Sequence, residues 1–421
     1  MKKYISILLA MMLAVCAAGC GQTPETPSSE GTEPSAQSGE ERDMPLQYGI
    51  NAHIYEQRPM DPSSTMDYIV EMTEILGVEC YRLSTPLESM FSVGEGDTPI
   101  FKEGFKELVH QIIEKMKSVG VKKFCAVSDS FIYPYGYQVT SNGAVPDPAV
   151  EAEMYMRWVK LFARAWGMIA AEFPEITYIE PMNEPDISGS NTFTKQGHQW
   201  GLDDGYKYTM TDKAHMIADL QYYISQEAKT ANPDILVTTP GFATRGEGQD
   251  VLDYLYEAIE SGAHPFDGEY ADTDPDHYFD VINFHSYLGS TTIDEYFEHI
   301  DTFYKACERH GDAGKRAILT EWGFTDYDNE AQEILNGENM TKLLEMFDAK
   351  MPYFEGVYLY MLNDYYDFSV DASEDNFGLF SSRGDPEKPG CPKPDAVAFY
   401  KYIHNTEDIA PLYKFCPELM P

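Results

Sequence analysis

Two glutamates each follow a short apolar run of the chain and stand beside side chains that can bind a substrate. Glu184 lies between Asn183 and a proline, and Glu321 is followed by Trp322. A carboxyl group donates a proton when it is neutral and attacks or activates water when it is ionised, so a pair in different environments can divide acid and base work. Cleavage of a glycosidic bond uses such a pair, and Asn183 would then bind a sugar hydroxyl.

The residues expected around the two glutamates indicate how the roles divide. Arg82 and Tyr287 can hydrogen-bond Glu321 and hold it ionised as the nucleophile. Glu184 would then be the protonated partner, and later the base. A second interpretation of Arg82 stays open, because Glu180 shares strand parity with Glu184 and can pair with the guanidinium.

Eight short apolar or β-branched runs alternate with amphipathic helical patterns along the chain. The predicted strands are Tyr48–Asn51, Cys80–Ser84, Lys123–Val127, Tyr178–Met182, Ile235–Thr239, Val281–His285, Ala317–Glu321 and Val357–Met361. Eight βα units predict a closed (β/α)8 TIM barrel from about residue 45 to residue 405. An open doubly wound sheet is the alternative, although the first βα turn, Gly49–His53, lacks a Gly-rich phosphate loop. Asp147-Pro148 is expected to open one long helix and Thr211 to precede another.

In such a barrel the catalytic groups gather at the carboxyl ends of the strands. The two glutamates would therefore meet at the barrel mouth, from the fourth and the seventh strand. The other polar side chains at predicted strand ends are Asn51, His53, Arg82, His285 and Tyr287. For the two histidines and Tyr287, a substrate contact and a purely structural role both stay open.

The N-terminus carries an export pattern rather than part of a fold. Two lysines precede a short apolar run that ends in Ala17-Ala18-Gly19-Cys20, which resembles the lipobox of bacterial lipoproteins. We expect residues 1–19 to be a signal peptide and Cys20 to carry the lipid that attaches the protein to the outer face of a bacterial membrane. Residues 20–44, rich in Ser, Thr, Pro and Glu, predict a flexible tether, and residues 45–421 form the folded domain.

The composition excludes some partners. The 421 residues include 30 Lys and Arg against 70 Asp and Glu, so the formal net charge of −40 repels nucleic acid. The 13% of aromatic residues provides rings that can pack in the core or stack on sugars. None of the seven cysteines has zinc-site spacing, and we expect no metal and no cofactor. Cys391 and Cys416 are the plausible disulfide pair, and the acidic loops are expected to be solvated rather than to bind calcium.

Several segments resemble the clan A glycoside hydrolases. Tyr178–Pro185 is similar to the strand-four signature of that clan, in which the acid/base Glu follows an Asn, and Ile318–Gly323 resembles its strand-seven nucleophile motif. The remaining matching positions are Arg82 on strand two, Phe284–Tyr287 on strand six, and Leu362–Asp364, Phe377–Phe380 and Lys393–Ala396 in the tail. The resemblance is greatest to family 39 and to cellulase-like members of family 5. It implies a retaining mechanism on the β-linked bonds of an oligosaccharide or polysaccharide.

The chain also departs from the pattern of that clan. Met182 stands where the clan usually has a Trp, and Ser128-Asp129-Ser130 stands where family 5 usually has a His. The strand-eight aromatic, commonly Trp, is replaced by Tyr360 or Tyr358. Two further rings could stack on a sugar or equally pack in the core, and these are Trp322 and Trp200.

Two hypotheses from different classes follow. A retaining glycosidase predicts that Glu184 and Glu321 lie about 5–5.5 Å apart. The alternative, motivated by the missing Trp residues, is a surface lipoprotein that binds glycans on the same fold without turnover. A metal-dependent barrel hydrolase is disfavoured, because only His53 and His285 are available at strand ends.

Overall fold

The computed structural model describes residues 45–52, 66–139, 145–187, 208–244, 250–262, 272–289, 291–326, 329–365, 376–382 and 390–421. The predicted signal peptide, Cys20 and the tether lie outside these ranges, as do His53 and Trp200. In the part of the chain that is described, no helix is both long and apolar enough to cross a bilayer.

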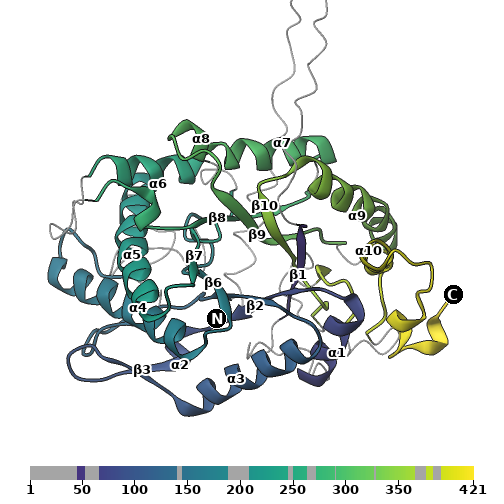
Figure 1. The fold of residues 1–421 in the computed structure, drawn as a ribbon, viewed down its shortest axis with the longest axis horizontal. Coiled ribbons are helices and arrows are strands. Elements are labelled where there is room, and N and C mark those ends of the chain that lie inside the picture. The colour runs from purple at the N-terminus through teal and green to yellow at the C-terminus, as the bar shows by residue number, and fades with distance from the viewer. Residues whose placement is uncertain are drawn as a thin grey trace, which may run out of the picture. The chain divides into compact units, whose positions relative to one another are not determined.

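Eight parallel strands form the centre of the fold (Figure 1). They are β1 Gln47–Asn51, β2 Cys80–Ser84, β5 Lys123–Val127, β6 Ile176–Glu180, β7 Leu236–Val237, β8 Val281–Tyr287, β9 Arg316–Gly323 and β10 Phe354–Leu359. The hydrogen-bonded order is β7-β6-β5-β2-β1-β10-β9-β8, and the bridges Thr238–Val281 and Phe242–Phe284 connect the two ends. The predicted (β/α)8 barrel is therefore confirmed, and the open doubly wound alternative is wrong.

Helices surround the strands in the ring visible in Figure 1. They are α1 Met66–Leu76, α2 Leu87–Met90, α3 Glu103–Ser118, α4 Ala152–Glu172, α5 Met210–Ala231, α6 Val251–Glu260, α7 Ile293–Tyr304, α8 Ala306–Arg309, α9 Glu330–Lys350 and α10 Pro394–His404. Short 3-10 turns lie at Pro275–His277, Ala410–Tyr413 and Pro417–Leu419. An antiparallel hairpin, β3 Phe91–Val93 and β4 Pro99–Phe101, is inserted between β2 and α3.

Two predicted helix starts differ from the structure, one because of a capping box and the other because a turn precedes the helix. Helix α5 begins after Thr209 rather than Thr211, because the Thr209 hydroxyl accepts from the Asp212 amide and the Asp212 carboxylate accepts from the Thr209 amide. Helix α4 begins at Ala152 rather than at Asp147-Pro148. The amides of Val150 and Glu151 donate to the Asp147 carbonyl and form a turn before the helix.

The alternation of strand side chains divides the core into two layers. Residues of one parity pack between the strands and the helices, among them Tyr81, Ile179 and Ile282. Residues of the other parity form a separate cluster within the barrel, made of Cys80, Cys125, Tyr178, Val281, Ile318 and Tyr358. Since Arg82 and Glu180 lie two residues further along their strands, the next interior layer toward the mouth is charged.

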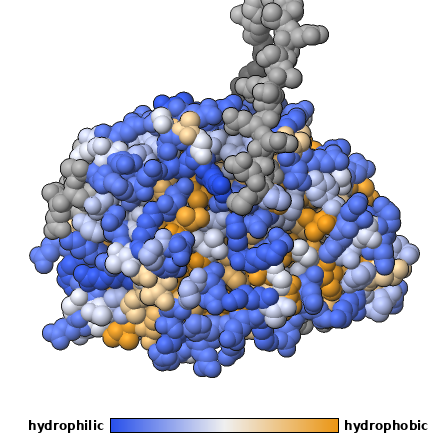
Figure 2. Space-filling model, viewed as in Figure 1, coloured by the Kyte–Doolittle hydropathy of each residue, from blue (hydrophilic) through white to orange (hydrophobic). Residues whose placement is uncertain are grey.

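The five cysteines of the folded domain are buried, and none of them forms a disulfide. The pairing of Cys391 with Cys416 that the sequence left open is therefore not formed. The outer surface is mainly hydrophilic on the face in Figure 2, in keeping with the large negative charge of the chain.

The contact between α9 and α10 gives a test of the packing. A Cβ added to Gly337 would lie 2.7 Å from Pro394 Cβ and 3.0 Å from its carbonyl carbon. We expect Gly337→Ala to lower the free energy of unfolding by roughly 1–3 kcal/mol, because overpacking outweighs the helix propensity of alanine. Gly104→Ala in α3 is the matched control, since nothing lies within 4 Å of its added Cβ. Urea unfolding measures both, and equal stabilities would contradict this close packing.

Candidate active site

The backbone that carries Glu184 is held between two neighbouring loops. The Asn183 amide donates to the Ser128 carbonyl at 3.2 Å, and the Glu184 amide donates to the Gly241 carbonyl at 2.9 Å. Glu184 itself has a φ of 44°, in the left-handed region that a non-glycine residue seldom adopts. Such a conformation costs of order 1–3 kcal/mol and persists where surrounding contacts enforce it. The loops after β5 and β7 therefore fix the direction of the Glu184 side chain.

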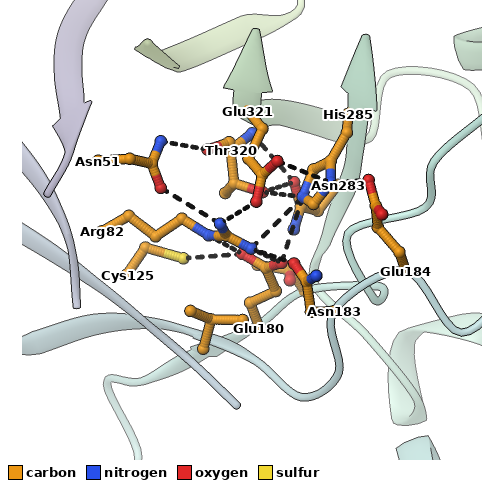
Figure 3. Close-up of polar contacts among 12 residues, drawn as sticks. Asn51, Arg82, Cys125, Glu180, Asn183, Glu184, Asn283, His285, Thr320 and Glu321 are labelled. Atoms are coloured by element: carbon orange, nitrogen blue, oxygen red, sulfur yellow. Dashed lines mark hydrogen bonds and ion pairs between the residues drawn. The ribbon is translucent and has the colours of Figure 1, made fainter. Parts of the chain in front are cut away.

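Arg82 is the centre of the polar cluster at the barrel mouth (Figure 3). Its Nε and Nη2 donate to Glu180 at 2.9 and 2.6 Å, and Nη2 also donates to Asn183 Oδ1 at 2.7 Å. Its Nη1 donates to Glu321 and to Asn51 Oδ1, the latter at 3.2 Å. The structure therefore satisfies both interpretations of Arg82, since one guanidinium pairs with both carboxylates.

Glu321 is surrounded by groups that favour its ionised form. Its Oε1 accepts from Arg82 and its Oε2 accepts from the Tyr287 hydroxyl. The Nδ1 of His285 lies 3.5 Å from Oε2. Burial alone would raise the pKa of this carboxyl, but His285, Arg82 and Tyr287 outweigh burial and lower the pKa. An ionised carboxylate in this position is suited to nucleophilic attack.

His285 lies between the two glutamates and is fully buried. Its Nδ1 is 2.9 Å from Glu184 Oε1, and its Nε2 is 3.2 Å from Thr320 Oγ1 and 3.5 Å from Glu180 Oε1. Burial opposes a charge on the ring, but Glu321 and the hydrogen bonds to Glu180 and Glu184 raise its pKa to about 10. The facing carboxyls therefore favour the imidazolium form of His285.

Glycine at position 241 makes room for this arrangement. A Cβ on Gly241 would lie 2.3 Å from both Glu180 Oε1 and His285 Nε2. Any side chain at this position would therefore separate the charged groups of the cluster.

The charges of the cluster balance when one carboxyl is neutral. Arg82 and His285 supply two positive charges, and Glu180, Glu184 and Glu321 are the facing carboxyls. The pKa of Glu180 is about 2, because Arg82 and His285 more than offset its burial. Glu184 is the most accessible of the three, with 23% of its side chain exposed against 9% for Glu321 and 0% for Glu180. Of the three carboxyls, Glu184 is therefore the one that a substrate can reach most readily.

The two glutamates lie close together. An oxygen of Glu184, an oxygen of Glu321 and a ring nitrogen of His285 all lie within 4.8 Å of one another. This bound on the approach of one oxygen to the other is shorter than the ~6.5–9.5 Å between the carboxyl groups of inverting glycosidases. The same three groups have the atom types of a metal site, but both oxygens of Glu321 already accept hydrogen bonds, one from Arg82 and one from the Tyr287 hydroxyl. The described residues therefore fit a carboxylate pair better than a metal centre.

Residues 47–353, most of this barrel, match the family described as cellulase, glycosyl hydrolase family 5. The chain belongs to this family. It is a glycoside hydrolase, and of the two families that its motifs resemble, family 5 is the one shown. None of the curated proteins matches the chain.

Solved structures of glycoside hydrolases share the fold of this family 5 chain at low identity. A family 39 enzyme from Bacteroides cellulosilyticus has 15% identity and a TM-score of 0.52, over 85% of this chain and 63% of that enzyme, so the present chain spans less than two thirds of its length. A family 5 xyloglucan-specific endo-beta-1,4-glucanase from a metagenomic library has 12% identity and a TM-score of 0.53. The match covers 84% of this chain and 96% of that enzyme. A family 5 lichenase from a Caldicellulosiruptor species has 14% identity and a TM-score of 0.54, and the match covers 91% of this chain and 100% of that enzyme.

Three partly exposed rings stand beside the nucleophile candidate of this family 5 enzyme. The Tyr287 ring meets those of Tyr360 at 6.1 Å and Phe377 at 5.1 Å, and the last two meet at 5.7 Å. Tyr360 therefore lies where an aromatic was expected at the eighth strand. Trp322 does not fulfil the expectation of a sugar platform, because it is fully buried and packs on Phe347 of α9 at 5.1 Å.

Sequence reasoning missed Asn283, one of the residues that support the cluster together with Thr320 and Asn51. Asn283 accepts from the Thr320 hydroxyl at 2.8 Å, and that hydroxyl in turn lies beside His285 Nε2. Asn51 donates to the Thr320 carbonyl at 2.9 Å, which ties β1 to β9. Strand alternation was the available signal, because Asn283 lies two residues before His285 and shares its direction.

The hydrogen bond from Tyr287 to Glu321 should be visible in the pH dependence of the reaction. In Tyr287→Phe the ionised form of Glu321 loses a donor, so its pKa should rise and the acidic limb of kcat/KM should move to higher pH. We expect kcat to fall about 10- to 100-fold, the range for a hydrogen bond to a charged group. The measurement is hydrolysis of an aryl β-glycoside across pH.

Tyr296→Phe is the control for this experiment. It removes a buried tyrosine hydroxyl that donates to the Ser286 carbonyl at 3.0 Å, away from Glu321. This variant should keep the position of the acidic limb even if its stability drops. An acidic limb that stays in place in Tyr287→Phe would show that the hydroxyl does not act on the ionisation of Glu321.

Proposed function

We propose that this protein hydrolyses β-linked glycosidic bonds of oligosaccharides or polysaccharides with retention of configuration. Glu321 is the nucleophile and Glu184 is the acid/base residue. The observation that carries the proposal is the arrangement of both carboxyls around His285 Nδ1, with an oxygen of each within 4.8 Å of the other. That separation suits direct attack on the substrate by one carboxylate.

The reaction proceeds in two displacements. In the first, Glu184 gives its proton to the leaving glycosidic oxygen while Glu321 attacks the anomeric carbon, so the C–O bond to the leaving group breaks and a glycosyl ester forms. In the second, the Glu184 carboxylate takes a proton from water. The resulting hydroxide oxygen bonds to the anomeric carbon, and Glu321 leaves as a carboxylate.

His285 can support both steps electrostatically. During the first step, negative charge disappears from Glu321 and appears on Glu184. The Nδ1 of the imidazolium lies 3.5 Å from an oxygen of the first and 2.9 Å from an oxygen of the second. One fixed cation therefore stays next to the negative charge in either state, and no reorganisation of the site is needed.

The substrate class follows from the family and from the charge of the chain. Members of family 5 with this fold include a xyloglucan-specific glucanase solved with cellotriose and a lichenase solved with cellotetraose. A net charge of −40 repels acidic polysaccharides. We therefore propose a neutral β-glucan chain as the substrate.

Substitution of each glutamate tests the assignment. Glu321→Gln should lower hydrolysis of every substrate by more than about 10⁴-fold, because no glycosyl ester can form. Glu184→Gln should lower hydrolysis of β-glucans by about 10²- to 10⁴-fold, the range of general acid–base catalysis. With an aryl glycoside whose leaving group needs no proton, Glu184→Gln should still show a burst of released aryl group, followed by slow turnover.

Glu355→Gln is the matched control. Glu355 on β10 is also a buried glutamate of the barrel, but it binds the Tyr178 hydroxyl and Arg316 of β9 rather than the mouth cluster. NMR of the first product distinguishes mechanisms, and a product of inverted configuration would exclude the ester intermediate. Sugar binding without hydrolysis, unchanged in Glu321→Gln, would instead support the glycan-binding alternative.

We also propose that the protein is exported and attached to the outer face of a bacterial membrane through Cys20. The lipobox-like end of the N-terminal apolar run supports this, together with the polar tether at residues 20–44. A lipid anchor followed by a flexible tether would let the barrel reach glycans outside the cell.

Cys20→Ala tests this location. The variant should lose incorporation of a labelled fatty acid and move from the membrane fraction to the released fraction, while the wild type remains membrane-bound. Cys416→Ala is the control, because that buried thiol lies in the folded domain. Equal labelling of Cys20→Ala and wild type would exclude Cys20 as the attachment site.

A further inference from the structure

Asp186 is a buried acid that the proposed reaction does not use. It follows Glu184 and Pro185 where the chain leaves β6, and only 3% of the residue is exposed. Its Oδ1 accepts from the amide of Ala243, in the loop after β7, at 3.0 Å. Its Oδ2 has no hydrogen-bond partner among the described residues. Burying a carboxyl with one oxygen unpaired costs free energy, so the contact with Ala243 requires a physical reason.

The contact replaces a missing bond of the parallel ladder between the segments after β6 and β7. The Gly241 amide donates to the Met182 carbonyl at 3.1 Å, and the Glu184 amide donates to the Gly241 carbonyl at 2.9 Å. Continued regularly, this pattern would join the Ala243 amide to the Glu184 carbonyl. The Ala243 amide donates to the Asp186 carboxyl instead.

The regular ladder ends because Glu184 leaves the extended conformation. Its φ of 44° lies in the left-handed region, which is unfavourable for a residue other than glycine. Pro185 comes next and has no amide with which to hold this turn. Asp186 holds it on both sides of its own backbone, because its carboxyl binds Ala243 and its carbonyl accepts from Lys213 Nζ of α5 at 2.9 Å.

The loop that Asp186 binds is also attached to the strand of His285. The His285 amide donates to the Phe242 carbonyl at 2.7 Å, and the Thr244 hydroxyl donates to the His285 carbonyl at 2.9 Å. Ala243 therefore lies between two residues that are bound to the backbone of His285. The hydrogen bond from Ala243 to Asp186 couples that backbone to the segment after β6.

We infer that Asp186 is a positioning residue that holds the acid/base group Glu184 in its left-handed conformation beside His285. The inference rests on the proposed function, in which Glu184 gives and takes the proton. Glu184 Oε1 lies 2.9 Å from His285 Nδ1 (Figure 3), and the bond from Asp186 to the loop after β7 maintains this placement. Asp186 acts through Glu184, because its own side chain is buried.

The contact needs an acceptor oxygen rather than a negative charge. Burial raises the pKa of Asp186 to about 6, although the hydrogen bond from the Ala243 amide opposes this rise. A neutral carboxyl keeps an acceptor oxygen, so Asp186 can bind the amide in either ionisation state. The side chain of asparagine has the same oxygen, whereas those of alanine and leucine have none. Asp186→Asn should therefore preserve the contact, and Asp186→Ala and Asp186→Leu should remove it.

The test separates a reaction that needs a proton from Glu184 from one that does not. The substrates are a soluble β-glucan and an aryl β-glucoside whose leaving group departs without protonation. In Asp186→Ala, kcat for the β-glucan should fall about 10- to 100-fold with KM little changed, since a small misplacement of a catalytic group has this effect. The pre-steady-state rate of aryl release should stay at the wild-type value, because attack by Glu321 is sufficient for that step. Asp186→Asn should restore most of the lost kcat.

Asp186→Leu keeps the experiment decisive if the alanine variant unfolds, because leucine has the branched shape of aspartate and fills the same space. It should show the same selective loss on the β-glucan. Asp280→Leu is the matched control. Asp280 accepts from the Val237 amide of β7 at 2.8 Å and precedes β8, at the end of the barrel opposite the mouth. This control should leave the ratio of the two rates unchanged even if it lowers stability.

Equal losses on both substrates in Asp186→Ala and Asp186→Leu, or a loss on neither, would overturn the inference while the catalytic assignment stands. An Asp186→Asn variant as slow as Asp186→Ala would also overturn it, because an acceptor oxygen would then not be what Asp186 supplies. A wild type that hydrolyses neither substrate, in contrast, would reject the proposed function together with this role of Asp186.

Discussion

The buried guanidinium of Arg82 is the interaction on which the barrel mouth depends. It joins β2 to Glu180 at the end of β6, to Glu321 on β9, to Asn51 on β1 and to Asn183 beyond β6. A charge taken out of water is costly unless it is paired and hydrogen-bonded, and Arg82 meets this condition by facing two carboxylates at once. The same requirement fixes the separation of the strands that carry those carboxylates. The contacts that stabilise buried Arg82 are therefore the same contacts that place the nucleophile Glu321.

His285 completes this arrangement because Arg82 alone cannot balance three carboxyls. A neutral imidazole would be the ordinary state of a fully buried histidine, yet the carboxyls from β6, β9 and the Glu184 loop raise its pKa to about 10. Each carboxyl then has a distinct environment. Glu180 faces both Arg82 and His285, is fully buried and stays a structural anion. Glu321 also faces both cations, but it lies at the barrel mouth. Glu184 is the most accessible of the three. Differences in pairing and exposure thus separate residues of identical chemistry into different roles.

The sequence predicts the barrel well because its signals are local. β2 and β5 have the predicted bounds, since their apolar runs are short and isolated. β6 ends two residues early, at Glu180, because Pro181 lacks the amide that a central strand needs. The hairpin of β3 and β4 was missed, as strands of three residues leave no readable period. In the site, residue types and order indicated Glu184, Glu321 and Arg82. The charge of His285 was not predictable, because it arises from carboxyls on separate elements.

The departures from the clan pattern become intelligible once burial is known. Met182 is only 2% exposed and packs in the outer core, so a Trp at this position would change packing beneath Asn183 rather than a surface that meets a sugar. Ser128 fills the place of the usual strand-three histidine, and its hydroxyl donates to the Ser130 carbonyl at 2.8 Å while its carbonyl holds the Asn183 amide. Ser128 therefore holds the Glu184 loop through a backbone hydrogen bond and adds no further cation to the cluster. The catalytic centre therefore combines charged side chains at the strand ends with backbone contacts from the loops after β5 and β7, which hold Asn183 and Glu184.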